Sequence, residues 1–222
     1  MENEEILNDT REKCYSCYRP KSSCMCEYIN KIETNTKFVL LMHPKEFKKT
    51  KNGTGRFTHI SLPNSSLFIG IDFNKHPLIN EMINNPTNNC FVLYPGVNSI
   101  KLNSVNIQEE NKTNIIFIID STWPCSKKIL AVSKNISGLP KISFEHTKSS
   151  AFKIKTQPNP YCLSTIESTL CVLELLNQHK IENIEDKNFE KFLEPFTQMV
   201  EYQVECATKP DRKVPRFLRR EN

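Results

Sequence analysis

A continuous apolar run, residues 115–119, constrains the fold of this chain more than any other segment. All five residues are β-branched or aromatic, which is typical of a strand that is buried on both faces of a parallel sheet. Asp120, Ser121, Thr122 and Trp123 follow directly, and Pro124 suits the first turn of a helix. Because parallel sheets bind ligands at the carboxyl ends of their strands, we expect these residues to line a ligand site. The alternative is a structural role, with a polar residue capping the helix and Trp123 in the core.

Further strands and helices alternate along the chain. The sequence predicts strands at residues 37–42, 67–71, 90–94 and 141–145, helices at 77–84 and 124–135, and polar loops at 45–56 and 103–114. Another helix is expected to begin at Ser164, because Ser164 and Glu167 have the spacing of a capping box. A second amphipathic region covers residues 186–207, and Pro195 is expected to kink or split it. This order predicts an α/β fold with a mainly parallel sheet.

Four of the nine cysteines lie close together near the N-terminus, at Cys14, Cys17, Cys24 and Cys26. The C-x2-C and C-x-C spacing predicts a tetrahedral zinc site, and four thiolate ligands leave no open position for catalysis. An iron–sulfur cluster is the alternative. The scattered remainder are expected to be ordinary core or loop thiols: Cys90, Cys125, Cys162, Cys171 and Cys206.

Charge is distributed unevenly. The chain carries 30 basic and 25 acidic residues, but its first residues are acidic and residues 209–222 hold six lysines and arginines. Such a basic tail suits a polyanionic partner, or else is a solvated tail. The beginning of the chain has no signal-peptide pattern, and no apolar run reaches the roughly 20 residues that span a bilayer. We therefore expect a cytoplasmic protein with reduced thiols and no membrane partner.

The motifs, taken in order, resemble the DTW-domain family over residues 14–180. After the cysteine cluster come Met42-His43-Pro44-Lys45-Glu46, Gly53-Thr54-Gly55-Arg56, Leu93-Tyr94-Pro95, Asp120-Ser121-Thr122-Trp123 and Ser164-Thr165-Ile166-Glu167. The Asp-x-Thr-Trp motif of the family is matched, with Ser121 where glycine is common. The segment similar to the family's Asn-Thr-Gly-Arg motif has Gly53 at its first position, and Asn52 lies one residue earlier.

The resemblance implies a tRNA-uridine aminocarboxypropyltransferase, which moves the 3-amino-3-carboxypropyl group of S-adenosylmethionine to N3 of a uridine. It also implies a knotted, SPOUT-like α/β domain. We expect three parts: an acidic tail and zinc knuckle at 1–35, the catalytic domain at 36–180, and a helical extension with a basic tail at 181–222. The implied partner is tRNA, and the protein is expected to be a monomer or homodimer.

The reaction requires that uridine N3 lose its proton, and Asp120 is the predicted catalytic base. Its alternative role is to accept hydrogen bonds from the cofactor's amino group, and Glu46 is a second possible base. Arg56 is expected to hold the cofactor carboxylate or an RNA phosphate, with His43 and Lys45 as further substrate contacts. The predicted cofactor-binding residues are Leu93, Tyr94, Pro95, Gly96, Asp120, Ser121, Thr122, Trp123, Ser164 and Thr165.

Lysines in the loop at 45–56 and the C-terminal tail are expected to form an RNA track. Trp123 is expected either to stack on the uridine or to fill the core. Two alternatives for the function are a SPOUT-type RNA methyltransferase and a non-catalytic zinc-containing RNA-binding module.

Overall fold

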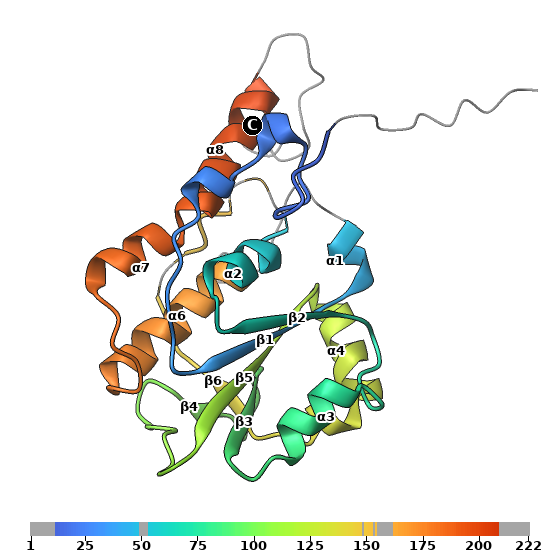
Figure 1. Ribbon diagram of the computed structural model, residues 1–222, viewed down its shortest axis with the longest axis vertical. Helices are drawn as coiled ribbons and strands as arrows, with labels where there is room; N and C mark the ends of the chain where they lie inside the picture. Colours follow the sequence, from blue (N-terminus) through green and yellow to red (C-terminus); the bar gives the residue numbers. More distant parts are fainter. Residues whose placement is uncertain (1–11, 49–52, 148, 153, 155–161, 209–222) are drawn as a thin grey trace, which may run out of the picture.

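A parallel sheet of six strands forms the centre of the molecule, with the strand order β2-β1-β5-β3-β6-β4 (Figure 1). The computed structural model describes residues 12–48, 53–147, 149–152, 154 and 162–208. Every strand pair in the sheet is parallel, so the predicted α/β class and sheet type are confirmed. The strands are β1 (Lys37–Met42), β2 (Ser65–Ile69), β3 (Asn88–Leu93), β4 (Ile100–Lys101), β5 (Thr113–Asp120) and β6 (Lys141–Ser143).

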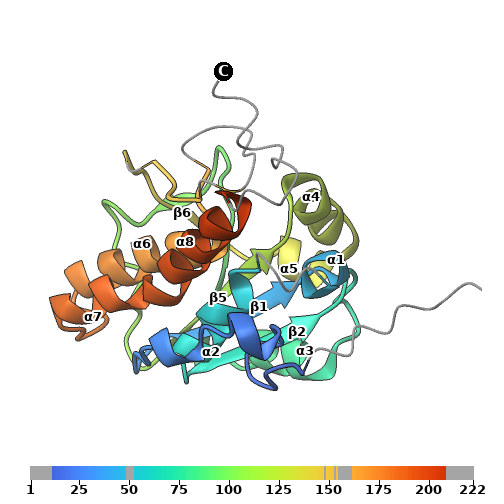
Figure 2. The same cartoon turned by 90° about the horizontal axis from the view of Figure 1, so that it is seen from above.

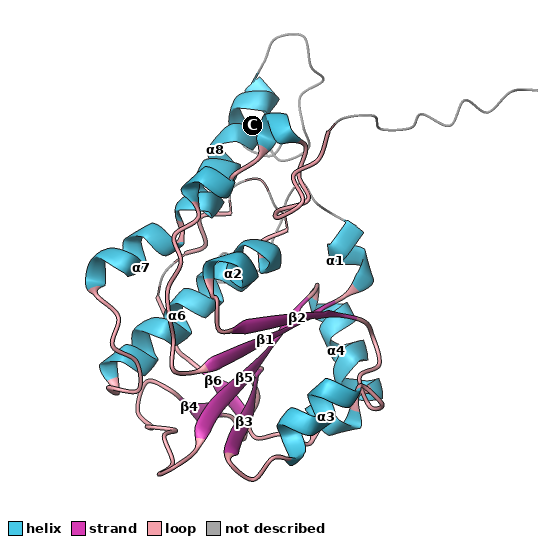
Figure 3. Cartoon of the chain, in the orientation of Figure 1, coloured by secondary structure: helices cyan, strands magenta, loops and turns pink. Residues whose placement is uncertain are grey.

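Helices cover both faces of the sheet, which explains the continuous apolar run in β5 (Figure 3). On one face Ile116 packs in a cluster with residues of α2 (Gly55–Ser61) and α6 (Thr165–Gln178). On the other face Phe117 packs with residues of α3 (Pro77–Asn84), α4 (Trp123–Val132) and α5 (Lys134–Ser137). Successive residues of the strand therefore enter different core layers.

The C-terminal helices and the cysteine-rich segment pack against each other. Helix α8 (Glu194–Thr208), which follows α7 (Asp186–Phe192), lies beside the cysteine-rich segment in both views (Figures 1 and 2). That segment contains the short 3-10 helices η1 (Lys21–Ser23) and η2 (Cys26–Tyr28). Met25 and Phe196 belong to the same hydrophobic cluster as the sheet, and Asn30 donates a hydrogen bond to Glu194 at 3.0 Å. One core thus joins residues from both ends of the chain.

Several elements differ from those expected. Helix α1 (Pro44–Lys48) occupies the start of the basic loop expected at 45–56, and α2 begins at its last two positions. The strand expected at 67–71 begins two residues earlier. The helix expected at 124–135 is interrupted at Ser133, whose buried hydroxyl donates to Ile71 O (3.2 Å) and accepts from Phe73 N (3.0 Å). These bonds turn Ser133 inward and end α4. The break near Pro195 is confirmed, because α7 ends at Phe192 and α8 begins at Glu194.

Among the residues that the structure describes, no helix combines the length and the apolar character needed to cross a membrane.

Candidate functional site

The carboxyl ends of three neighbouring strands meet at Asp120. The last residue of β1, Met42, pairs with Asp120 at the end of β5, and His43 N donates to Asp120 O at 3.0 Å. On the other side of β5, Leu93 at the end of β3 pairs with Ile118. Asp120 is only 6% exposed. Asp120 thus lies at the carboxyl end of its strand, as expected, and its role there stays a prediction.

The Asp120 carboxylate lies between the first turns of two helices. Thr165 Oγ1, at the start of α6, donates to Asp120 Oδ1 at 2.6 Å. Gly55, at the start of α2, is so close that a β-carbon there would lie 2.3 Å from Oδ2. The cap position of α4 is occupied by Thr122. Asp120 is therefore not the cap of α4, and its role as base or cofactor ligand stays a prediction.

His43 is buried and holds the turn into α1. Its Nδ1 accepts a hydrogen bond from Lys45 N at 3.1 Å, and its carbonyl accepts one from Glu46 N at 2.8 Å. The Lys45 side chain is exposed on α1. Nδ1 of His43 thus serves the backbone of α1. The contacts of His43 and Lys45 with a substrate remain predictions.

A cavity of about 320 Å³ opens beside the strand ends. Trp123 and Tyr94 meet edge to face across one wall, with ring centroids 5.9 Å apart. Trp123 is 42% exposed, so it is a wall residue rather than part of the core. Burial raises the pKa of the Tyr94 hydroxyl, which therefore remains protonated. Six predicted cofactor residues line this cavity: Leu93, Tyr94, Pro95, Ser121, Trp123 and Thr165.

A smaller polar recess of about 60 Å³ adjoins the cavity. Ser121, Leu163 and Thr165 line both spaces, which places them at the junction. The recess also contains the carboxylates of Asp120 and Glu46, together with Gly53, Thr54 and Ser164. Of the predicted cofactor residues, Gly96 and Thr122 line neither space.

Sequence reasoning missed a second group of cavity residues. Phe144 and His146 follow β6 and line the larger cavity, with ring centroids 5.6 Å apart. Cys162 and Leu163 come from the segment before α6, although Cys162 had been interpreted as an ordinary thiol. The strand-end rule that identified Asp120 could have identified Phe144 and His146, because they follow another parallel strand of the same sheet.

A buried carboxylate, Glu167, organises the start of α6. It accepts hydrogen bonds from Ser164 N (2.8 Å) and Ser164 Oγ (2.6 Å), which confirms the predicted capping box. It also accepts bonds from Ala151 N (2.8 Å) and Ser150 Oγ (2.8 Å), far earlier in the chain. Glu167 therefore ties together two segments, 150–151 and 164–167, next to the bond between Thr165 and Asp120.

Arg56 follows Gly55 in α2 and turns its side chain toward two aromatic rings. Its guanidinium carbon lies 4.1 Å from the Tyr18 ring centroid and 5.2 Å from that of Phe47. Burial lowers the Arg56 pKa, and the negative charge of Asp120 is among the interactions that raise it. Its Nη2 atom is buried and has no hydrogen-bond partner among the described residues. Only part of the predicted RNA-binding surface can be described, because Lys49, Lys51 and the tail 209–222 lie outside the described residues.

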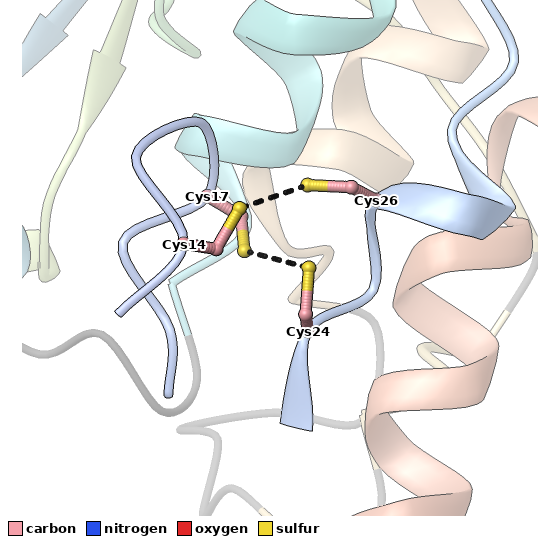
Figure 4. A group of neighbouring side chains, drawn as sticks. All are labelled: Cys14, Cys17, Cys24 and Cys26. Carbon is pink, nitrogen blue, oxygen red and sulfur yellow. Dashed lines mark hydrogen bonds between the residues drawn. The ribbon is translucent and has the colours of Figure 1, made fainter. Parts of the chain in front are cut away.

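The four clustered cysteines fit a tetrahedral metal site (Figure 4). Their sulfur atoms lie within 4.8 Å of one another, and two pairs are separated by 3.6 Å (Cys14–Cys26) and 3.7 Å (Cys17–Cys24). A Zn–S bond of about 2.3 Å implies sulfur atoms about 3.8 Å apart at the corners of a tetrahedron. The sulfur positions therefore match the predicted zinc ligands.

The thiols of the cluster differ in their electrostatic environment, and a buried cation lies beside them. A hydrogen bond from the Cys17 backbone lowers the pKa of the Cys14 thiol to about 6, whereas burial raises the pKa of the Cys24 and Cys26 thiols. Arg19, only 2% exposed, lies close enough to Cys17 and Cys24 to interact with their charges, and its Nε donates to Ser23 O at 2.7 Å. A buried cation requires nearby negative charge, which thiolate ligands of a metal ion supply.

Curated relatives are consistent with this site. The chain is 24% identical to mouse tRNA-uridine aminocarboxypropyltransferase 2 over 175 residues, which cover 77% of this chain and 58% of the relative. It is 28% identical to the Drosophila melanogaster protein of the same name over 173 residues, which cover 75% and 67%. The Macaca fascicularis protein is 25% identical, with 76% and 58% covered. The chain thus spans about three fifths of the length of its mouse and macaque relatives.

No solved structure matches the chain significantly. The family model described as the DTW domain matches residues 11–204, nearly the whole length of the chain. This match covers the cysteine cluster, both cavities and all the helices that enclose them. The chain therefore belongs to the DTW domain family.

Proposed function

We propose that this chain transfers the 3-amino-3-carboxypropyl group of S-adenosylmethionine to N3 of a uridine in tRNA. The observation that carries the proposal is the junction at Thr165, where a buried, hydrogen-bonded Asp120 carboxylate meets a cavity large enough for a nucleoside. The names of the curated relatives support the same reaction and the same class of substrate.

The larger cavity fits the cofactor in size and chemistry. Its volume of about 320 Å³ falls in the range of small-molecule sites. The aromatic edges of Tyr94 and Trp123 suit a purine ring, and the hydroxyls of Ser121 and Thr165 can bond to the sugar and amino-acid groups. When bound, S-adenosylmethionine supplies a γ carbon activated by its sulfonium, and 5′-methylthioadenosine is the neutral leaving group.

The residues of the recess then have two tasks. We assign to Asp120 the removal of the N3 proton, since a carboxylate at the junction can reach a uridine that enters from the recess. Thr165 fixes the plane of that carboxylate through its bond to Oδ1. To Glu46, which also lines the recess, we assign the acceptance of hydrogen bonds from the amino group of the transferred chain. Orienting the chain in this way favours attack at the γ carbon over attack at the methyl group.

Arg56 supplies the positive charge for an oxyanion of the substrates. Its buried Nη2 has no acceptor among the described residues, and an unpaired buried donor of this kind costs free energy. A carboxylate of the cofactor or a phosphate of the RNA would satisfy it. The exposed side chains of Lys45 and Lys48 on α1 extend this positive charge toward the RNA.

A zinc ion held by Cys14, Cys17, Cys24 and Cys26 is proposed to be structural. Four thiolates fill a tetrahedral shell and leave no position for a reacting group. The knotted SPOUT-like topology, the three-part domain division, the cytoplasmic location and the monomeric or dimeric state remain predictions.

The deciding experiment incubates the protein with unmodified tRNA and S-adenosylmethionine and measures the mass of the digested nucleosides. A uridine heavier by one aminocarboxypropyl group, absent with Asp120→Asn, is the expected result. A methyl gain would indicate a methyltransferase instead. Bound RNA without any gain in mass would indicate a non-catalytic binding module.

A further inference from the structure

We propose that the cysteine knuckle, defined as residues 12–28, positions the Arg56 guanidinium for oxyanion binding through the ring of Tyr18. Tyr18 is therefore a positioning residue for the site, although it does not line either cavity. The role of Arg56 as an oxyanion ligand rests on the proposed function, whereas its placement by the knuckle is a separate structural claim.

Two consecutive residues of the knuckle contact two consecutive residues of α2. Tyr18 lies under the guanidinium of Arg56, with 4.1 Å between the guanidinium carbon and the ring centroid. In the second contact the knuckle supplies the cation: the guanidinium carbon of Arg19 lies 5.9 Å from the centroid of the Phe57 ring. Each contact pairs a cation with an aromatic face, which is favourable and directional. Together they fix the knuckle to the first turn of α2.

That first turn also packs against the Asp120 carboxylate. Gly55, directly before Arg56, approaches the Asp120 carboxylate so closely that no β-carbon fits between them. A shift of the α2 backbone would therefore disturb both Asp120 and Arg56. The knuckle contacts this turn through Tyr18 and Arg19.

Aromatic rings hold Arg56 without using its hydrogen-bonding groups. Tyr18 and Phe47 approach the guanidinium at 4.1 and 5.2 Å, and their rings are tilted by 57° to each other. Among the described residues Arg56 forms no ion pair, and its Nη2 is buried without a hydrogen-bond partner. The partly exposed Arg56 side chain lines neither cavity, and a guanidinium held by ring contacts rather than by protein acceptors can turn its N–H groups toward a carboxylate or phosphate.

The turn between Cys14 and Arg19 sets the conformation of Tyr18. The residue directly follows Cys17 and has a φ of 59°, the left-handed region that a tyrosine rarely adopts. Tyr18 N donates to Cys14 O at 2.8 Å, and Cys14 N donates to Arg19 O at 2.8 Å. The turn is thus closed by backbone bonds between one predicted metal ligand, Cys14, and the two residues that follow another, Cys17. The unfavourable φ is maintained because the surrounding contacts, including the sulfur cluster, hold the turn in place.

The test compares Tyr18→Ala with Tyr18→Phe and with Tyr15→Ala in the full chain. Phenylalanine keeps the ring, and Tyr15 is a neighbouring tyrosine of the same knuckle that is 91% exposed. All three variants retain the four cysteines, and measured zinc content together with the unfolding temperature identifies folded, metal-loaded protein. A first readout, independent of activity, is the nuclear magnetic resonance of the Arg56 Nε–H group, which the rings shift upfield.

The second readout separates the two sources of the oxyanion. S-adenosylhomocysteine carries the amino-acid carboxylate and 5′-methylthioadenosine lacks it, so their affinities report a contact to that carboxylate. The salt dependence of tRNA affinity reports a phosphate contact. Tyr18→Ala is expected to weaken the affected ligand roughly three- to thirtyfold, as loss of a cation–π contact does. Arg56→Gln should weaken the same ligand, and the double variant should lose little more.

The inference is supported if the Arg56 resonance moves in Tyr18→Ala and after chelation of zinc, while Tyr18→Phe and Tyr15→Ala resemble the wild type. The inference is overturned if the Arg56 resonance has the same chemical shift in metal-loaded Tyr18→Ala as in the wild type. It is also overturned if Arg56→Gln weakens ligand binding and Tyr18→Ala does not. If the wild type adds no mass to tRNA, the proposed function fails and the resonance alone decides this inference.

Discussion

The hydroxyl of Thr165 donates a 2.6 Å hydrogen bond to Oδ1 of Asp120, across 45 positions of sequence. The bond joins the first turn of α6 to the last residue of β5. It also lies where the two cavities meet, since Thr165 lines both. A short hydrogen bond to a carboxylate is among the stronger interactions available to a threonine, and it restricts rotation of the acid.

Thr165→Val should slow the proposed transfer because the Asp120 carboxylate loses its orienting donor. A hydrogen bond to a charged group contributes about 1.5–3 kcal/mol, which corresponds to roughly a ten- to hundredfold lower rate. Single-turnover formation of the modified uridine measures this effect, and Thr165→Ser should retain most of the rate. Thr169→Val is the matched control, because its hydroxyl bonds only to the Thr165 carbonyl one turn away. Equal losses in the two valine variants would contradict the assignment.

Gly55→Ala should damage the site even though alanine favours helices. In an open helical position the substitution stabilises by up to about 1 kcal/mol. Here the new methyl group would lie 2.3 Å from Asp120 Oδ2, so the carboxylate or α2 must move. We expect loss of most activity and a lower unfolding free energy in urea. Gly138→Ala is a control for a tight glycine elsewhere, with its nearest atom, the Lys134 carbonyl oxygen, at 3.2 Å. Its activity per folded molecule should be unchanged.

Local patterns explain which parts of the site the sequence could predict. The buried strand before Asp120, the capping box at Ser164 and the cysteine spacing each depend on residues close together in the chain. Residues close together in the sequence are sufficient to predict such elements. Because Asp120 directly follows a predicted parallel strand, it was expected at the carboxyl edge of the sheet, where the structure has it.

The unpredicted features depend on contacts between distant segments. The glycine-rich stretch before Arg56 favoured a loop, yet α2 forms there because its buried side, including Phe57, packs in the core. The contacts of Gly55 with Asp120 and of Arg56 with Tyr18 join residues far apart in the chain, so no motif or residue spacing in the sequence predicts them. The cavity residues Phe144 and His146 follow β6, but the strand expected at 141–145 includes Phe144, so the sequence does not show that the strand already ends at Ser143. The structure of such segments is determined by tertiary packing rather than by the secondary-structure propensity of their residues.

Zinc should be bound at one ion per chain and should stabilise the fold. Cys24→Ser removes one of four soft ligands, so metal content and the thermal unfolding midpoint are both expected to fall. For a chain of this size, each kcal/mol of lost stability lowers the midpoint by roughly 2–4 °C. Elemental analysis and circular dichroism provide the two measurements. Cys206→Ser, in α8 outside the cluster, should change neither. Full metal content in Cys24→Ser would argue against a four-cysteine site.

Acidification should destabilise the protein partly through His59. Burial lowers the His59 pKa from 6.5, with the Arg56 charge as a further cause, and the ring bonds to Ser65 Oγ at 2.7 Å. Just below pH 6.5 the unfolded chain binds a proton there and the folded chain does not. The unfolding free energy therefore falls as the pH drops below 6.5, and this contribution is fully present above it. Urea unfolding between about pH 5 and pH 7 should show a shallower slope for His59→Asn. Identical slopes would exclude His59 as a cause.

Glu167→Gln should loosen the cavity wall as well as the start of α6. The carboxylate accepts bonds from Ser150, Ala151 and Ser164, and an amide must turn an N–H group toward some of these donors. Unsatisfied buried donors cost about 1–3 kcal/mol each, so we expect a loss of roughly 2–4 kcal/mol in unfolding free energy.

The same substitution should weaken the binding of S-adenosylhomocysteine, because Glu167 holds the two ends of a segment that contributes Cys162 and Leu163 to the cavity. Urea denaturation and titration calorimetry measure the two effects under conditions where the variant is folded. Glu190→Gln, exposed on α7, is the control and should alter neither. A variant that loses stability but binds the ligand as the wild type does would restrict Glu167 to capping α6.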